Sequence, residues 1–359
     1  MNKRQVVRVV MGLLVALWAM PGSEASADVS VTDAIPTIVA GDPDYTAAPD
    51  LPAYRVDTND STSAFAGVGS LEISYNSNTY TCSGTLISPW HVLTAGHAVD
   101  VAGDDGVVDV LPGNVTFHLN ASGDNSSNIT AKKITIHPDF KGFANPAVND
   151  DLAIITLSEA APAGVPIYDL YTLPVTAATT LTLVGYGRSG DGRNGFSTGA
   201  SYTVKRTGQN AADWFVINDE DAAPGPYNDF TGDDNPAGTF NEVFFFDFDA
   251  PPGYLDNDDQ PVDGICGGNS LGNLVETTVG GGDSGGPSFI YDGSEYLIAG
   301  VNTFGYKPLA LPSYALFGSG GGGMLVPAYA DWINSVIPEP ATVGLLLLGG
   351  LFILRRRTA

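Results

Sequence analysis

The chain has 359 residues, 43% of them hydrophobic and 15% charged, so it can bury a sizeable core in two or three domains and is not a disordered chain. Its 40 acidic and 15 basic residues give a net charge of −25, which excludes nucleic-acid binding because the phosphate backbone would be repelled. Four histidines and two cysteines leave little material for a zinc cluster.

The first 27 residues have the three parts of a secretory signal peptide. Three basic residues within the first eight positions precede an apolar run over residues 9–20, and the small residues Ala25–Ala27 follow it. This run is too short to span a bilayer comfortably, which disfavours a permanent membrane anchor. We therefore expect cleavage before Asp28 and export of the rest of the chain.

The body of the chain consists of short β-type runs bounded by Gly, Pro, Asn or Asp, a pattern typical of an all-β sandwich or barrel. The predicted strands are Ser70–Tyr75, Gly84–Ile87, Val115–Leu119, Ile129–Ile136, Leu152–Leu157, Thr180–Val184, Ser201–Thr207, Val243–Phe248, Ser288–Tyr291 and Tyr296–Val301. Helical periodicity is confined to Ala328–Val336, where apolar residues fall on one face.

Three segments of the body carry the residue types of nucleophilic catalysis. They are Val92–Ala98 with His97, Asn149–Ile155 with Asp150 and Asp151, and Gly281–Pro287 with Ser284. A serine hydroxyl needs an adjacent imidazole to remove its proton, and a carboxylate fixes the tautomer of that imidazole. The chain order histidine, aspartate, serine differs from that of subtilisins and α/β-hydrolases.

These segments resemble the histidine, aspartate and serine motifs of the chymotrypsin-like (trypsin-type) serine endopeptidases. The likeness runs over residues 38–337 and includes Leu183–Gly187 and Gly300–Gly305. It implies two six-stranded antiparallel β-barrels, with the site in the cleft between them, and a short C-terminal helix. The N-terminal barrel would cover about residues 38–170 and the C-terminal barrel about 171–337.

The resemblance also implies roles for individual residues. His97, Asp151 and Ser284 would form the catalytic triad, with Asp150 as the alternative to Asp151. The backbone N–H groups of Gly282 and Ser284 would form the oxyanion hole, because flanking glycines let a substrate approach the backbone. No cofactor is needed for this chemistry.

The same comparison places a specificity pocket around Thr278, Thr303, Phe304 and Gly305. Thr278 falls at the pocket floor, where trypsins carry an aspartate, so an uncharged apolar or aromatic residue is expected before the cleaved bond. Gly305 and the run of glycines at 320–323 are expected to leave the pocket open. A register shift of two residues would instead place the carboxylate of Glu276 in the pocket.

Ile38 begins a segment, Ile-Val-Ala-Gly, that resembles the start of mature family members. There the new amino group pairs with the aspartate before the catalytic serine, here Asp283. Residues 28–37 would then be a short propeptide. The alternative is that this segment is an ordinary strand, because many bacterial relatives do without this activation step.

Two features limit the resemblance. Cys82 stands where the family often has a cysteine bridged to the residue after the catalytic histidine, which here is Ala98, so Cys82 either pairs with Cys266 or stays free. Residues 213–263 form an insert with acidic clusters, which we interpret as solvated loops. Calcium binding is the alternative, although no cluster has the spacing of a calcium loop.

The C-terminal segment, residues 338–359, contains Pro338-Glu339-Pro340, an uncharged apolar stretch and three arginines at 355–357. It resembles the PEP-CTERM sorting signal of Gram-negative bacteria, which implies an exosortase-type partner and delivery to the cell surface. A plain membrane anchor is the alternative, with the arginines on the cytoplasmic side.

The sequence thus predicts a secreted serine endopeptidase acting on polypeptides. Two alternatives remain at this point. One is a non-catalytic surface or matrix binding module on the same scaffold, since a fold alone does not establish a function. The other is an ester hydrolase, which would use the same acyl-enzyme chemistry.

Overall fold

The computed structural model describes residues 29–30, 38–121, 123–143, 148–216, 241–254, 270–308 and 311–337. The predicted signal peptide, the C-terminal sorting segment, Cys266 and the acidic clusters of the insert lie outside these residues. Within them, no helix is long and apolar enough to cross a membrane.

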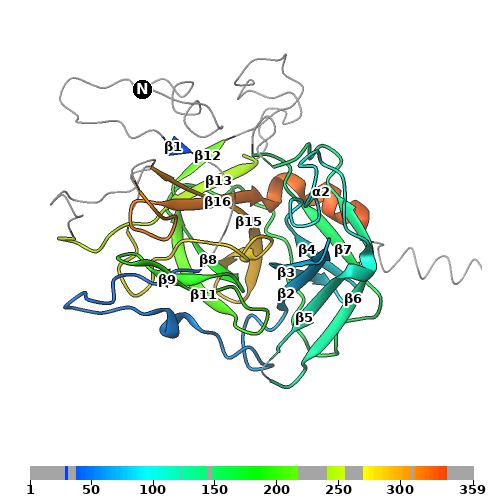
Figure 1. Cartoon of the computed structure of the whole chain (residues 1–359), viewed down its shortest axis with the longest axis horizontal. Coiled ribbons are helices and arrows are strands. Elements are labelled where there is room, and N and C mark those ends of the chain that lie inside the picture. Colours follow the sequence, from blue (N-terminus) through cyan, green and yellow to red (C-terminus); the bar gives the residue numbers. More distant parts are fainter. Residues whose placement is uncertain are drawn as a thin grey trace, which may run out of the picture.

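Six antiparallel strands of the N-terminal half close into a barrel in the order β2-β3-β4-β7-β6-β5 (Figure 1). Alternate residues of these strands point inward, as in β5, where Phe117 and Leu119 are fully buried. The strands and their two 3₁₀ helices are β2 (Val68–Tyr75), β3 (Asn78–Ser88), β4 (His91–Thr94), β5 (Val115–Leu119), β6 (Ser127–Ile136), β7 (Ala153–Leu157), η1 (Pro52–Arg55) and η2 (Pro112–Asn114).

The C-terminal half forms a second antiparallel sheet in the order β11-β8-β14-β15-β16-β13-β12, with β1 paired to β15 and a separate hairpin of β9 and β10. The bounds of these elements are β1 (Val29–Ser30), β8 (Thr179–Gly185), β9 (Ser189–Asp191), β10 (Gly195–Thr198), β11 (Arg206–Ala212), β12 (Trp214–Val216), β13 (Val243–Asp247), β14 (Pro287–Tyr291), β15 (Tyr296–Pro308) and β16 (Gly320–Leu325).

The all-β prediction is confirmed, and the fold is consistent with a chymotrypsin-like double barrel. The two edge strands of the second sheet are joined in a way that the sequence did not indicate. Among the described residues, no backbone ladder joins its edge strands β11 and β12. The amide of Asn210 on β11 instead donates to the carbonyls of Asp247, at the end of β13, and of Thr277, at 2.6 Å each. A side chain therefore provides part of the closure of this sheet.

Two predicted elements differ from the structure. The run predicted over Ser201–Thr207 begins as a turn, in which Val204 N–H donates to the carbonyl of Ser201, and the strand β11 follows at Arg206. The glycine-rich strand β16 was not predicted, because four successive glycines have no side-chain alternation that could indicate a strand.

The C-terminal helix α2 (Val326–Val336) is confirmed, and it returns the chain to the first barrel (Figure 1). Val326, Tyr329 and Ile333 are buried at the helical spacing of three to four residues. The rings of Tyr329 and Trp332 lie edge-on to the ring of His137, with centroids 5.3 and 4.8 Å apart. The helix thus contacts the loop between β6 and β7.

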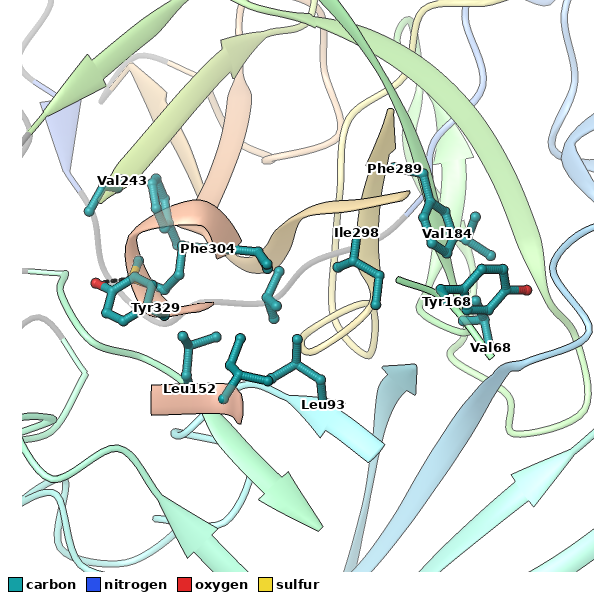
Figure 2. Close-up of a cluster of buried hydrophobic side chains, with 14 of the residues drawn as sticks. Val68, Leu93, Leu152, Tyr168, Val184, Val243, Phe289, Ile298, Phe304 and Tyr329 are labelled. Carbon is teal, nitrogen blue, oxygen red and sulfur yellow. Dashed lines mark hydrogen bonds between the residues drawn. The ribbon is translucent and has the colours of Figure 1, made fainter. Parts of the chain in front are cut away.

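One hydrophobic core joins the two units. Figure 2 shows Leu93 of β4 and Leu152, which precedes β7, facing Phe304 and Ile298 of the second sheet. All four side chains are fully buried. Because the residues that follow β4 and precede β7 carry two of the predicted catalytic side chains, this core fixes their position relative to the second sheet.

Candidate active site

His97 lies three residues beyond the end of β4, in a turn anchored at Gly96. The carbonyl of Gly96 accepts the backbone N–H groups of Val99 and Asp100 at 3.0 and 3.3 Å. A Cβ atom on Gly96 would lie 3.2 Å from Asp151 Oδ1, which is a tight contact. The glycine at this position therefore lets the carboxylate of Asp151 approach the turn.

Asp151 accepts two hydrogen bonds from His97. Its Oδ2 lies 2.7 Å from Nδ1 of the imidazole, and its Oδ1 lies 2.7 Å from the backbone nitrogen of the same residue. Asp151 is fully buried, immediately before β7. Two bonds to one residue fix both the position and the orientation of the imidazole ring.

Asp150 points elsewhere. Its backbone has a positive φ of 51°, which directs its side chain away from that of Asp151. Its Oδ1 lies 3.4 Å from Nδ1 of His137. The structure therefore places Asp151, and not Asp150, against His97. The backbone conformation explains why two adjacent aspartates face different histidines.

Ser284 completes the hydrogen-bonded chain. Its Oγ lies 2.9 Å from Nε2 of His97, on the far side of the ring from Asp151. The serine is held by β3 of the first barrel, where Ser83 N–H donates to the Ser284 carbonyl at 2.7 Å. The structure thus brings together the three residues that the sequence singled out. Asp151 follows His97 by 54 positions in the chain, and Ser284 follows it by 187.

The loop around Ser284 presents unused N–H donors, among them those of Gly282 and Ser284. Within the described residues, neither the Gly282 N–H nor the Ser284 N–H donates to an acceptor of the protein. The Gly282 carbonyl accepts a hydrogen bond from the Ser83 hydroxyl at 2.7 Å. The backbone φ of Gly282 is 111°, a value that residues with a side chain rarely adopt. Both N–H groups are therefore available to a negatively charged oxygen beside Ser284.

The electrostatic setting of His97 favours its protonated form. Burial alone lowers the pKa of the imidazole, but the charge and hydrogen bond of Asp151, with smaller contributions from Asp104 and Asp100, outweigh it, so the pKa is raised above 6.5. A raised pKa makes the imidazole a better proton acceptor when the Ser284 hydroxyl reacts.

A cleft of about 820 Å³ adjoins these groups. It is lined by His97 and Ser284, and also by side chains that the sequence did not single out, among them Tyr80, Phe143 and Arg188. The cleft is large enough for several residues of an extended chain.

Cys82 also lines this cleft, and burial raises the pKa of its thiol to about 12. It forms no disulfide within the described part of the chain. Its pairing with Cys266 stays a prediction.

The residues predicted to form the specificity pocket lie in different environments. Thr278 and Thr303 are fully buried, and neither hydroxyl has a hydrogen-bond partner in the described structure. Phe304 has its ring in the core, 5.1 Å between centroids from Phe245, so its side chain is not available to line a pocket. A Cβ on Gly305 would make only ordinary contacts of 3.6 Å or more.

The glycine run of β16 does not widen a pocket, which corrects the expectation from the sequence. A Cβ on Gly322 would lie 2.5 Å from Cζ of Phe304, and one on Gly320 would lie 2.4 Å from Cζ of Tyr306. Aromatic rings of β15 already occupy the space that these glycines leave. Only Gly305 still fits the expectation.

The carboxylate of Glu276, the residue of the alternative pocket register, is occupied by other groups. It is fully buried and accepts the N–H groups of Asp249 and Leu271 and the hydroxyl of Ser270. Burial raises its pKa to about 7. These contacts fix its carboxylate against the segments around residues 249 and 270.

Sequence reasoning missed Ser83, which holds both Gly282 and Ser284. It also missed Arg206, a buried cation whose pKa is lowered by burial. The one sequence feature that could have drawn attention to Arg206 is its charge, since the body of the chain has few basic residues. Among the described residues, no group of three or more His, Cys, Asp or Glu side chains is placed to hold a metal ion.

Comparison with known proteins supports the resemblance drawn from the motifs. Residues 61–218 match the family model described as Trypsin. The matched segment contains His97 and Asp151 and ends before Ser284.

Several known proteins are similar over part of the chain. Putative trypsin-6 from Homo sapiens is 32% identical over 137 residues, which cover 36% of this chain and 47% of that protein. Brachyurin from Leptuca pugilator is 32% identical over 122 residues, 33% of this chain and 50% of that protein. Trypsin I-P1 from Gallus gallus is 31% identical over 133 residues, which cover 36% of this chain and 47% of that protein. The chain thus spans about half the length of these relatives.

We predict that the pKa of His97 falls when Asp151 is replaced by Asn, because the attraction of the carboxylate is lost while burial remains. The measurement is a pH titration of the imidazole ring protons by NMR, in a Ser284→Ala background that prevents self-digestion. Asp150→Asn is the matched control and is expected to leave the His97 pKa unchanged. An unchanged pKa in Asp151→Asn would contradict this account of the imidazole.

Proposed function

We propose that the chain, of which residues 61–218 match the Trypsin family model, is a serine endopeptidase that cleaves polypeptides through an acyl-enzyme on Ser284. The observation that carries this proposal is the hydrogen-bonded chain from Asp151 through His97 to Ser284, with contacts of 2.7 and 2.9 Å, beside two unused N–H donors. A scaffold that only bound ligands would have no need for this arrangement.

The proposed reaction starts with attack of Ser284 Oγ on the carbonyl carbon of the substrate, while Nε2 of His97 takes the hydroxyl proton. Asp151 stabilises the imidazolium and keeps Nδ1 protonated. The N–H groups of Gly282 and Ser284 bind the negatively charged oxygen of the tetrahedral intermediate. His97 then gives its proton to the leaving amine. Water attacks the resulting acyl-enzyme with His97 again as the base, which releases the acid and restores Ser284.

The proposed substrate is an extended polypeptide with an uncharged residue before the cleaved bond. Thr278 and Thr303 supply buried hydroxyls rather than charges, and the nearest acid in that loop, Glu276, is bound to other groups. A lysine or arginine side chain would be desolvated there without a countercharge. An apolar side chain would gain roughly 25 cal/mol per Å² buried.

We also propose export by the N-terminal signal and delivery to the cell surface through residues 338–359. The support comes from the order of basic, apolar and small residues at the start of the chain and of Pro-Glu-Pro, apolar and basic residues at its end. The partner implied by the second signal is an exosortase-type enzyme.

The first test is labelling with a fluorophosphonate probe and cleavage of casein. Ser284→Ala is expected to abolish both, since it removes the nucleophile. Asp151→Asn should lower kcat roughly 10⁴-fold, because an amide holds the wrong imidazole tautomer.

Asp150→Asn is the matched control for Asp151→Asn and should retain most activity, since Asp150 faces His137. Casein cleavage at the parent rate by Ser284→Ala would refute the proposed mechanism. A greater loss at Asp150 than at Asp151 would show that the assignment of the acid is wrong.

A second test measures kcat/KM on fluorogenic peptides that differ only in the residue before the cleaved bond. We expect Leu, Phe, Tyr or Met to exceed Lys and Arg by at least about 100-fold, since an uncompensated buried charge costs several kcal/mol. Thr278→Asp should raise the activity toward Lys and Arg. A preference of the parent protein for Arg or Lys would mean that Glu276 or another acid reaches the pocket.

The two terminal signals are tested by N-terminal sequencing and intact mass of the protein released at the surface of a host with an exosortase. We expect a chain that has lost residues 1–27 and is cut near Pro338–Pro340. Replacing Pro338, Glu339 and Pro340 with alanines should leave the C-terminal segment attached. A surface protein that keeps all residues to 359 would instead support a plain anchor.

A further inference from the structure

The cleft beside Ser284 extends to one side of the reaction centre. It is bounded by the serine loop, by residues 79–82 of β3 and by the chain that follows His97. The two threonines of the pocket proposed for the residue before the cleaved bond, Thr278 and Thr303, do not line it. A substrate with that residue in its pocket therefore places the residues after the cleaved bond in this cleft.

The strand β3 offers the cleft an open edge. β3 pairs with β2 from Asn78 onward, but among the described strands its other edge is paired only from Thr85, where β4 begins to pair. The carbonyl of Thr81 on this edge would lie 3.2 Å from a Cβ on Gly282, so the edge runs beside the serine loop. An extended polypeptide that leaves the reaction centre can lie along such an edge.

The loop after His97 forms another wall of the cleft and is rigidly built. The carboxylate of Asp100 accepts the N–H groups of Asp104 and Gly106 at 3.0 and 2.8 Å. Asp100 is only 5% exposed, so it serves the structure of the loop. Asp104 lines the cleft and is exposed, so its carboxylate is the acidic group of this wall that a substrate can reach.

The position of Asp104 is fixed by the segment that ends at Phe143. One carboxylate oxygen of Asp104 accepts the Phe143 N–H, and a Cβ on Gly142 would lie 2.0 Å from the Asp104 carbonyl. The ring of Phe143 lies edge-on to the imidazole of His97, with centroids 5.4 Å apart. A fixed carboxylate and an aromatic residue therefore border the cleft together, next to the catalytic histidine.

We infer that this cleft selects substrates with Lys or Arg among the two residues that follow the cleaved bond, and that Asp104 is the residue that determines this specificity. The inference rests on the proposed function and deepens it. A cationic side chain forms a charge-assisted hydrogen bond with a carboxylate and is attracted to the face of an aromatic ring. Its apolar stem packs on the wall while its charged end reaches Asp104.

The charge of Asp104 reaches the reaction centre. It contributes to the raised pKa of His97, after the larger effect of Asp151. His97 gives its proton to the nitrogen of the first residue after the cleaved bond, so a charge that acts on the imidazole also acts on the side chains of that residue and its neighbour.

The serine-loop side of the cleft carries the opposite charge. Arg188 lines the cleft, its N–H donates to the Gly281 carbonyl at 2.9 Å, and its guanidinium lies 4.7 Å from the centre of the Phe196 ring. Arg188 is thus held to the serine loop and to β10, whereas Asp104 is held to Phe143. A cation in the cleft is attracted by Asp104 and repelled by Arg188, so the two residues should have opposite effects on the same substrate.

The experiment measures kcat/KM of the secreted full chain on fluorogenic peptides with Leu before the cleaved bond. The peptides carry Lys, Arg, Gln or Glu at the first or at the second position after it. We expect Lys and Arg to exceed Gln about three- to tenfold at one of these positions, the size of effect of an ion pair at a partly exposed site. Glu should be the poorest of the four.

Three variants assign the preference to its source. Asp104→Asn removes the charge, while its side-chain oxygen can still accept the Phe143 N–H, and it should lower the ratio of Lys to Gln peptides to about one. Arg188→Gln should raise this ratio. Asp169→Asn removes an equal charge from an exposed position outside the cleft and is the matched control, with the ratio of the parent.

Two readouts separate substrate binding from a general effect on the site. A change in His97 alters all substrates alike, so it cancels in the ratio of Lys to Gln peptides. A methyl ester with the same acyl part has no residue after the bond, and Asp104→Asn should change its hydrolysis no more than that of the Gln peptide. The Lys preference of the parent should weaken as salt rises from roughly 50 to roughly 500 mM, because salt screens an exposed ion pair.

The outcomes distinguish this inference from the proposed function. If the parent neither labels at Ser284 nor cleaves any of the peptides, the proposed function is wrong and the inference falls with it. If the parent cleaves Lys, Gln and Glu peptides equally at both positions, or Asp104→Asn keeps the Lys preference, only the inference is refuted. Should Asp104→Asn not fold, the parent and Arg188→Gln decide: a Lys preference that ignores both salt and the loss of Arg188 would overturn it.

Discussion

Two hydrogen bonds from His97 to the buried carboxylate of Asp151 join the end of β4 to the start of β7, and the rest of the candidate site depends on them. They can form only because the barrel places the two chain segments side by side and because Gly96 leaves room for the carboxylate. The leucines next to these segments, Leu93 and Leu152, pack into the core shared with the second sheet. The orientation of the imidazole is therefore a property of the whole fold rather than of one loop.

The serine loop is constrained in a complementary way, by contacts from both units. Ser83 of the first barrel binds both Gly282 and Ser284, and the segment after β8 binds Asp283 and Gly281. Within the described residues, the N–H groups of Gly282 and Ser284 stay unused while most other polar groups of the loop are occupied. Such preorganised donors stabilise negative charge without reorganisation during the reaction, which is why they contribute strongly to catalysis.

The sequence was sufficient for the features that depend on local patterns. Short motifs around His97 and Ser284 identify the chemistry, and alternating residues identify most strands. Long-range and conformational features were not accessible in this way. The choice between Asp150 and Asp151 depends on one positive φ, and the glycines of β16, which resembled open space, are filled by the rings of Phe304 and Tyr306. Ile38 is fully buried in the uncut chain, and its pairing with Asp283 after cleavage stays a prediction.

The proposed mechanism requires Ser284 to form a covalent acyl-enzyme with its substrate. The most direct test is mass spectrometry of the protein quenched with acid during turnover of an ester or peptide that deacylates slowly. We predict a single acyl group on the peptide that contains Ser284, absent from Ser284→Ala and strongly reduced in His97→Ala. Turnover without any adduct at Ser284, or with an adduct at another residue, would contradict the account.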